Sequence, residues 1–114
     1  MSAEHSTRTW EQAVQWLRSQ PDRRDLVLAG YYDDPVEVAA DRYWRSPEWL
    51  SARPLLPAAP GARALDIGAG RGIASYALAK DGFEVIALEP DGSSLVGAGA
   101  IRALGKRLEL SLAA

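Results

Sequence analysis

The chain contains 114 residues, 47% of them hydrophobic and 25% charged, with a formal net charge of −2. This length fits one small domain, and a chain so close to neutral is not expected to bind nucleic acid. Cysteine is absent and His5 is the one histidine, so disulfides and thiolate ligands are excluded and no metal site is expected. No apolar stretch approaches the roughly 18 residues of a membrane span, and the N-terminus lacks a signal-peptide core, so the predicted location is the cytoplasm.

The first half of the chain is predicted to be helical. Thr9 and Gln12 have the spacing of a capping box, and the apolar residues that follow recur at helical intervals. This pattern predicts an amphipathic helix that ends before Pro21. A second helix is expected over residues 22–29, with Gly30 placed to end it.

Two further helix starts combine a capping residue with a proline. Asp34-Pro35 predicts a helix that reaches residue 44 or 45, and Ser46-Pro47 predicts one that Pro54 stops near residue 52 or 53. A linker rich in proline and alanine, residues 55–61, then leads into the second half of the chain.

Aromatic residues are concentrated in this helical half, which holds all four tryptophans and three of the four tyrosines. Aromatic side chains bury large areas, so the simpler interpretation is that they pack the helices onto the second half. The alternative is a lid across a ligand, with Tyr31, Tyr32, Tyr43 or Trp44 in contact with it.

The rest of the chain is organised around residues 63–91. Residues 64–67 predict a short buried strand, which Gly68, Gly70 and Gly72 follow as a turn where a ligand could approach the backbone closely. A helix is expected from about residue 72 to 80, with Gly82 as its left-handed stop. Residues 83–88 predict a second strand.

An acidic residue, Glu89, directly follows this second strand. Glu89 comes about 20 residues after the loop glycines, the offset at which a βαβ unit presents a carboxylate to a ribose diol. Pro90 cannot donate a ladder hydrogen bond, and this fixes where the strand ends.

Together these motifs resemble those of class I S-adenosylmethionine-dependent methyltransferases. Leu-Asp-Ile-Gly-Ala-Gly-Arg-Gly (residues 65–72) resembles the first motif of that family, and Ala-Leu-Glu-Pro-Asp (residues 87–91) resembles its acidic second strand end. The resemblance implies S-adenosyl-L-methionine as the cofactor. The residues that it places at the cofactor are Asp66, Gly68, Ala69, Gly70, Gly72, Glu89, Pro90 and Asp91.

The resemblance also implies roles for the acids, each with a simpler alternative. Asp66 would join the network around the methionyl ammonium, or it would only cap backbone N–H groups of the loop. Glu89 would accept both ribose hydroxyls, or it would be a solvated charge at the strand end. Asp91 would approach the adenosine or cap the next helix. Arg71 is interpreted as a solvent-facing loop residue.

Two elements are expected after residue 91. Ser93 or Ser94 would cap a helix over residues 95–104 that Gly105 closes. Gly97 and Gly99 lie inside it, which indicates either a poor helix start or close backbone approach at that point. Residues 108–112 alternate apolar and polar side chains and predict a third strand.

The predicted fold is therefore α/β: a truncated Rossmann-like three-layer sheet of about three parallel strands in the order 3-2-1, after an N-terminal all-helical extension. Residues 1–60 form the extension or lid, and residues 61–114 the first half of the cofactor-binding domain. Members of the family have about seven strands, so the first strand here, with Leu65 and Ile67, would lie at an open edge. Aggregation, a homodimer or a complementing chain at that edge is expected.

The function expected from the resemblance is transfer of a methyl group to an unidentified acceptor, a small molecule, with this chain as the cofactor-binding N-terminal part of the enzyme. No general base is assigned. Two alternatives stay open: a non-catalytic module for S-adenosylmethionine binding or dimerisation, and a fragment of an NAD(P)-dependent oxidoreductase.

Overall fold

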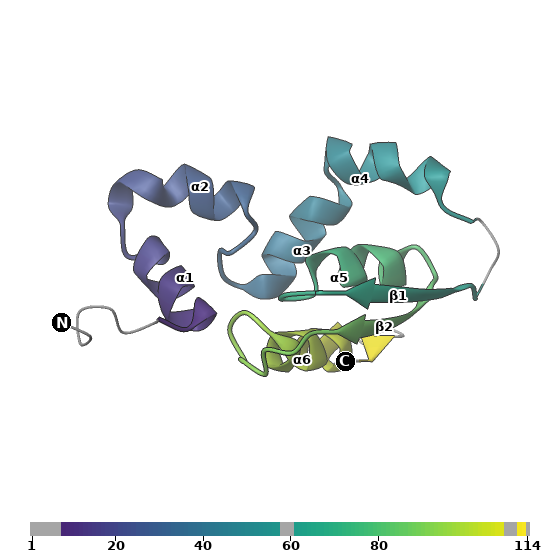
Figure 1. Cartoon of the computed structure of the whole chain (residues 1–114). Helices are drawn as coiled ribbons and strands as arrows, with labels where there is room; N and C mark the ends of the chain where they lie inside the picture. The colour runs from purple at the N-terminus through teal and green to yellow at the C-terminus, as the bar shows by residue number, and fades with distance from the viewer. Residues whose placement is uncertain (1–7, 58–60, 109–111, 114) are drawn as a thin grey trace.

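The computed structural model describes residues 8–57, 61–108 and 112–113, and it has the α/β class expected from the sequence (Figure 1). The helices are α1 (Trp10–Arg18), α2 (Arg24–Ala29), α3 (Val36–Trp44), α4 (Pro47–Ala52), α5 (Ile73–Lys80) and α6 (Ala98–Leu108), with 3₁₀ turns η2 (Pro21–Arg23) and η3 (Arg53–Leu55). The strands are β1 (Arg63–Ile67), β2 (Glu84–Leu88) and β3 (Leu112–Ala113). Within the described ranges, no helix is long and apolar enough to cross a membrane.

The capping box predicted for the first helix is confirmed. The Thr9 hydroxyl accepts a hydrogen bond from the Gln12 backbone N–H at 3.1 Å, and the Gln12 side chain accepts one from the Thr9 N–H at 2.9 Å. Two backbone donors that have no partner within the helix are thereby satisfied, so α1 begins where the local sequence specifies.

The segment after α1 differs in detail from the expectation. The sequence predicts one helix over residues 22–29, whereas the structure has η2 followed by α2. The helix does end at Gly30, but Gly30 keeps a right-handed conformation with φ −89°. The left-handed residue is Tyr31, with φ +59°, a conformation that is costly for a bulky side chain and is found where surrounding structure enforces it.

The predicted role of Asp34 as a helix cap is wrong. Helix α3 starts at Val36 with Pro35 in the cap position, and no side chain accepts a hydrogen bond there. The Asp34 carboxylate instead accepts hydrogen bonds from Arg18 and from Arg71. The Asp34 carboxylate binds two guanidinium groups from distant segments and not the backbone N–H groups of α3, because charge-assisted hydrogen bonds are stronger than neutral ones.

The next helix follows its sequence signal. The Ser46 hydroxyl accepts a hydrogen bond from the Trp49 backbone N–H at 3.2 Å, as expected of a capping serine before proline. Helix α4 ends at Ala52, and Pro54 lies in the 3₁₀ turn η3 that follows it. The predicted stop near residue 52 or 53 is confirmed.

The strands form a parallel sheet in the order β1-β2-β3. Strands β1 and β2 pair with Arg63 opposite Glu84 and Ile67 opposite Leu88, and the short β3 pairs with the other side of β2. Strand β1 is therefore an edge strand within the described residues, and the parallel arrangement predicted from the sequence is confirmed.

The last helix lies later in the chain than expected. The sequence predicts a helix over residues 95–104 closed by Gly105, but α6 starts at Ala98 and continues through Gly105 to Leu108. Leu108 is consequently helical and does not open the third strand, and among the described residues of the predicted segment Leu112 lies in β3. Residues 109–111 lie outside the described residues.

Two glycines at the start of α6 have a packing reason. A Cβ at Gly97 would overlap the Asp91 carbonyl oxygen, and one at Gly99 would lie 2.9 Å from the Ser94 Cα. The helix therefore begins against the backbone of the loop that precedes it. Both alternatives expected for these glycines are observed: residues 95–97 are not helical, and the backbone of this loop approaches closely.

Helices cover one face of the sheet. Val85 and Ala87 of β2 point to that side and are 3% and 1% exposed. Buried Ala40, Tyr76 and Leu104 join α3, α5 and α6 into one hydrophobic cluster, so part of the helical first half packs directly on the helices of the second half (Figure 1). Ile73, the first residue of α5 after the glycine loop, packs against this cluster.

Candidate functional site: a pocket over the glycine loop

The glycine loop joins β1 to α5 and has the conformation that its composition predicts. Gly68, Gly70 and Gly72 have φ angles of +71°, +59° and +88°, values at which any other L-residue would be strained. The Gly70 N–H donates a hydrogen bond of 2.8 Å to the Glu89 carboxylate. The predicted strand-end acid therefore lies directly beside the loop.

Most backbone N–H groups of this loop are already used within the protein. Those of Gly68 and Ala69 donate to the Leu88 carbonyl oxygen at 2.8 and 3.1 Å, and that of Gly72 donates to the Ala69 carbonyl oxygen. With Gly70 bound to Glu89, these four donors do not point at a ligand. A loop that binds phosphate needs such donors turned outward, so the engagement of these four donors favours close approach of a ligand over anion binding at this loop.

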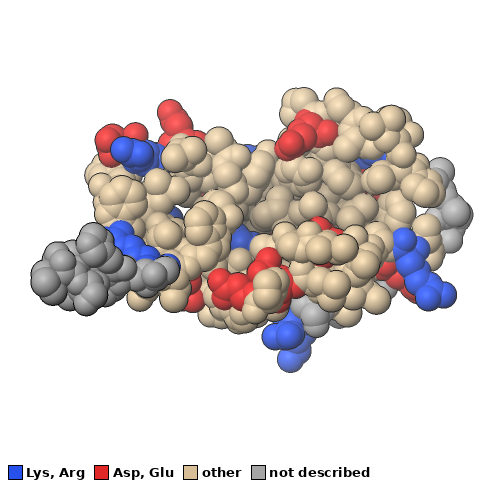
Figure 2. Space-filling model, in the orientation of Figure 1, with Lys and Arg blue, Asp and Glu red and all other residues tan. Residues whose placement is uncertain are grey.

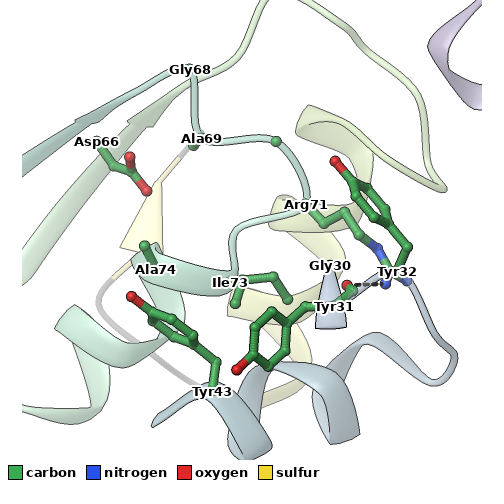
Figure 3. Close-up of a pocket in the computed structure, with 11 residues that line it drawn as sticks. Gly30, Tyr31, Tyr32, Tyr43, Asp66, Gly68, Ala69, Arg71, Ile73 and Ala74 are labelled. Atoms are coloured by element: carbon green, nitrogen blue, oxygen red, sulfur yellow. Dashed lines mark hydrogen bonds between the residues drawn. The ribbon is translucent and has the colours of Figure 1, made fainter. Parts of the chain in front are cut away.

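A pocket of about 320 Å³ lies over the loop. One wall is the end of β1, the loop and the start of α5, and the other is the turn after α2 together with Tyr43 of α3 (Figure 3). Its lining residues are Gly30, Tyr31, Tyr32, Tyr43, Asp66, Gly68, Ala69, Gly70, Arg71, Ile73 and Ala74. The volume lies in the range of small-molecule sites.

The pocket brings together half of the residues predicted for the cofactor. Asp66, Gly68, Ala69 and Gly70 line it, whereas Gly72 and residues 89–91 do not. A Cβ at Gly72 would lie 3.0 Å from the Ile101 side chain of α6, so this glycine is needed for packing. Cofactor contact by Gly72, Glu89, Pro90 and Asp91 stays a prediction.

Asp66 does not cap the glycine loop, which was the simpler of its two expected roles, and its contact with a methionyl ammonium stays a prediction. Its Oδ2 accepts a hydrogen bond of 2.7 Å from the Ser75 hydroxyl of α5, and no bond from a loop N–H to Asp66 is seen among the described residues. Ser75 is fully buried. The bond orients the carboxylate at the pocket wall and leaves further acceptor positions on its oxygens.

Glu89 joins the glycine loop to the end of β2. Its Oε1 accepts from Gly70 N–H and its Oε2 from Asp91 N–H at 3.0 Å. The reading of Glu89 as merely a solvated charge is therefore wrong, because two backbone donors hold it. Each carboxylate oxygen has a second lone pair, so contact with a hydroxyl pair is still compatible with this arrangement.

Asp91 organises the next turn. Its Oδ1 accepts from the Ser93 N–H at 2.9 Å, and the Ser93 hydroxyl accepts from Leu95 and Val96 N–H groups. Both side chains thus stabilise the turn before α6 and do not cap the helix itself. The expected capping serine is present, but it acts several residues before Ala98.

Arg71 is the residue that the sequence interpretation missed most clearly. It is only 3% exposed, although it is expected to face solvent. Its guanidinium donates to the backbone carbonyls of Leu95, Tyr31 and Asp33 at 2.8 to 3.0 Å. It also forms an ion pair of 2.8 Å with Asp34.

These contacts make Arg71 the link between both walls of the pocket (Figure 3). The glycine loop carries the side chain, and the turn after α2 supplies three of its four partners. Burial lowers the pKa of Arg71, and the nearby Arg18 acts in the same direction. An arginine between two turn glycines was the available sequence signal, but its partners lie 24 to 40 residues away.

Three tyrosines form the wall opposite the loop. The rings of Tyr31 and Tyr43 meet edge to face at 5.2 Å between centroids, and the Arg42 guanidinium lies 5.0 Å from the Tyr31 ring centroid. Burial raises the pKa of Tyr43, with added contributions from Glu48, Tyr31 and Asp66. The Tyr43 hydroxyl therefore stays protonated at neutral pH and is available as a donor.

Trp44 and Trp49 join helices of the first half of the chain to α5. The indole N–H groups of Trp44 and Trp49 donate to the Asp81 carboxylate at 2.9 and 2.8 Å, which fastens α3 and α4 to the end of α5. Trp44 does not line the glycine-loop pocket. Of the four lid candidates, Tyr31, Tyr32 and Tyr43 lie at the pocket.

The charged residues lining the pocket are Asp66 and Arg71. The Arg71 cation is engaged by the protein itself, so Asp66 is the charge presented to a ligand. On the molecular face in Figure 2, acidic and basic side chains are interspersed and neither sign forms an extended patch. In the part of the chain that the structure describes, no three His, Cys, Asp or Glu side chains are grouped as metal ligands would be.

Gly72→Ala tests the packing role of the third loop glycine. We expect a loss of about 2 kcal/mol in the free energy of unfolding, from the strained φ and from displacement of Ile101. Gly82→Ala is the matched control, because its φ is also positive at +99° while no atom lies within 4 Å of the added Cβ. Urea unfolding should show a smaller loss for the control, and equal losses would contradict the packing role.

The chain was compared with protein-family models, with curated proteins and with solved structures, and no match was found in any of the three.

Proposed function

We propose that the chain binds S-adenosyl-L-methionine in the pocket over the glycine loop and is the cofactor-binding part of a class I methyltransferase with a Rossmann-like fold. The observation that carries the proposal is a pocket with Asp66 beside the glycine loop on one wall and three tyrosines on the opposite wall, where four of the loop N–H donors are engaged within the protein. The resemblance of residues 65–72 and 87–91 to that family's motifs supports the same assignment.

The charges of the pocket favour a cationic ligand over a dinucleotide. S-adenosylmethionine carries a sulfonium and an ammonium group, and both are attracted by a carboxylate and by aromatic rings. Asp66 supplies the carboxylate, and Tyr31 and Tyr43 supply rings and hydroxyls. The pyrophosphate of NAD needs outward-pointing N–H groups or an available cation. The N–H groups of Gly68, Ala69, Gly70 and Gly72 and the Arg71 guanidinium are engaged within the protein, so they do not supply these groups.

When bound, S-adenosylmethionine supplies an activated methyl group, which leaves its sulfur as an acceptor atom attacks in line from the opposite side. The chain would contribute binding and orientation: Asp66 holds the ammonium end, and the tyrosine wall excludes water from the reacting centre. Glu89 would hold the ribose from the far side of the loop. The acceptor, proposed to be a small molecule, and any general base have no assigned residues here.

Titration calorimetry with S-adenosylmethionine, S-adenosylhomocysteine and NAD tests the proposal. We expect S-adenosylmethionine to bind and NAD to give no measurable heat. Asp66→Asn should weaken S-adenosylmethionine binding by about tenfold or more, since a charged hydrogen bond contributes about 1.5 to 3 kcal/mol. The fold should survive, because the asparagine carbonyl oxygen can still accept from Ser75.

Asp22→Asn is the matched control, because Asp22 is exposed on η2, which supplies no lining residue of the pocket. It should leave the affinity unchanged. Binding of NAD alone would contradict the proposal and favour an oxidoreductase fragment. Equal affinities of the native protein and Asp66→Asn would show that the ligand does not use this carboxylate.

A further inference from the structure

The sheet has one covered face and one open face. On the open face, Leu65, Ile67, Ile86 and Leu88 are 58%, 75%, 52% and 48% exposed. They form two cross-strand pairs, Leu65 with Ile86 and Ile67 with Leu88, so the four side chains are contiguous. Contiguous exposed aliphatic side chains of this kind mark interaction surfaces.

A charged pair completes the same face. Arg63 of β1 lies opposite Glu84 of β2, and both are exposed. By the alternation of strand side chains, they share the face with the aliphatic pairs. Across β1 and β2, each row of the face therefore has one residue from each strand, with the basic group on β1 and the acidic group on β2, and exposed Ala113 of β3 extends the row of Ile86.

This pattern is self-complementary under a twofold axis that runs parallel to the strands. Such an axis turns a second sheet face down and places its β2 over β1 of the first. Arg63 then meets Glu84 of the other copy twice, and each aliphatic row meets the same row of the other copy. A second copy of this chain thus matches both the apolar and the charged groups.

We propose that the open face, defined by Arg63, Leu65, Ile67, Glu84, Ile86 and Leu88, binds a second copy of the chain to form a face-to-face homodimer. The contact is smaller than the 20 to 30 residues a side of a standard interface, so the dimer is weak and depends on protein concentration. Asp66 points to the helix side of β1, and the glycine-loop pocket stays open in the dimer. The proposal does not depend on what that pocket binds.

Sedimentation equilibrium of the 114-residue chain over a range of concentrations tests the dimer. The native chain should show a monomer–dimer equilibrium. Ile67→Lys should raise the dissociation constant by about tenfold or more, because a buried aliphatic side chain contributes that much or more. Leu55→Lys is the matched control: Leu55 is 85% exposed but lies on η3, away from the sheet, and it should have no effect.

Charge reversal tests the pairing between copies. Arg63→Glu and Glu84→Arg should each weaken the homodimer by about tenfold, since each brings like charges together. An equimolar mixture of the two variants should recover native affinity as a heterodimer, because opposite charges meet again across the axis. Glu84→Arg also separates this contact from pairing through the β1 edge, which would leave Glu84 outside the contact.

A native chain that stays monomeric up to millimolar concentration would overturn the proposal and leave the face to a different chain. A dimer that tolerates Ile67→Lys, or a mixture of charge variants that fails to recover affinity, would also overturn it. Circular dichroism of each variant checks that the monomers keep the native fold.

Discussion

Arg71→Met is expected to destabilise the protein by about 3 kcal/mol. The buried guanidinium satisfies the backbone carbonyls of Tyr31, Asp33 and Leu95, and its bond to the Asp33 carbonyl is itself buried. Methionine fills much of the space but donates no hydrogen bond, so these acceptors lose their partners, and each such loss costs about 1 to 3 kcal/mol. For a domain of this size the change is a large part of the total stability.

Urea unfolding followed by circular dichroism measures this loss. Arg102→Met is the matched control, because Arg102 is exposed on α6, and it should change the free energy of unfolding by less than about 0.5 kcal/mol. Arg71→Lys should fall in between, since an ammonium keeps the charge but cannot reach four partners as the planar fork does. Equal effects of Arg71→Met and Arg102→Met would show that the guanidinium does not hold the pocket walls together.

Asp81→Asn is expected to cost about 3 kcal/mol at pH 7, with a cost that shrinks in acid. The carboxylate accepts from the indoles of Trp44 and Trp49 and from Arg53 at 2.7 Å. Burial by itself raises the pKa of Asp81, but the hydrogen bonds from Trp44, Arg53 and Trp49 outweigh it and bring the pKa below the ordinary 3.8. The asparagine side chain has one acceptor oxygen and an NH₂ group that is itself a donor. At least one of the three donors from Trp44, Trp49 and Arg53 therefore loses its acceptor.

The direction of the pH dependence follows from the lowered pKa. A carboxyl that titrates lower in the folded than in the unfolded state contributes its full stability above pH 3.8, and the contribution is lost as the pH falls through the folded value. The difference in unfolding free energy between the native protein and Asp81→Asn should therefore be largest at pH 5 to 7. It should decrease below pH 3.8.

Urea titrations of both proteins at several pH values from 7 to 3 measure this difference. Asp22→Asn, at an exposed position on η2, should show no such difference at any pH. The native protein should also lose stability in acid through Asp33, whose pKa is lowered by its hydrogen bonds from Arg42. A constant difference across the pH range would contradict the role given to the Asp81 carboxylate.

Local signals were sufficient for much of the fold. The Thr9–Gln12 box and the Ser46 cap start helices where they predict, because each satisfies donors within three residues of itself. The two parallel strands and the glycine loop between them also follow from the sequence, since residue spacing there reflects backbone geometry. Where a local signal failed, at Asp34, distant arginines offered stronger partners.

The candidate site was predictable only in part. Asp66 and the first two loop glycines line the pocket as expected, because a strand and its following turn are contiguous in sequence. For the aromatic residues of the helical half, the sequence allowed two interpretations, packing or a lid over a ligand. The structure places some of these residues in packing contacts and others at the pocket. Trp44 and Trp49 pack against Asp81, whereas the tyrosines face the loop.

By itself, then, the sequence determined the starts of α1 and α4, the parallel α/β arrangement and the turn at residues 68–72, since these depend on hydrogen bonds and backbone angles of neighbouring residues. Only the tertiary structure decided that Arg71 is buried, that Tyr31 is left-handed and that one face of the sheet is open. Those features depend on contacts between residues far apart in the chain, such as the 40 residues between Tyr31 and Arg71. Packing of α3 on α5 brings such residues together, and no local spacing encodes it.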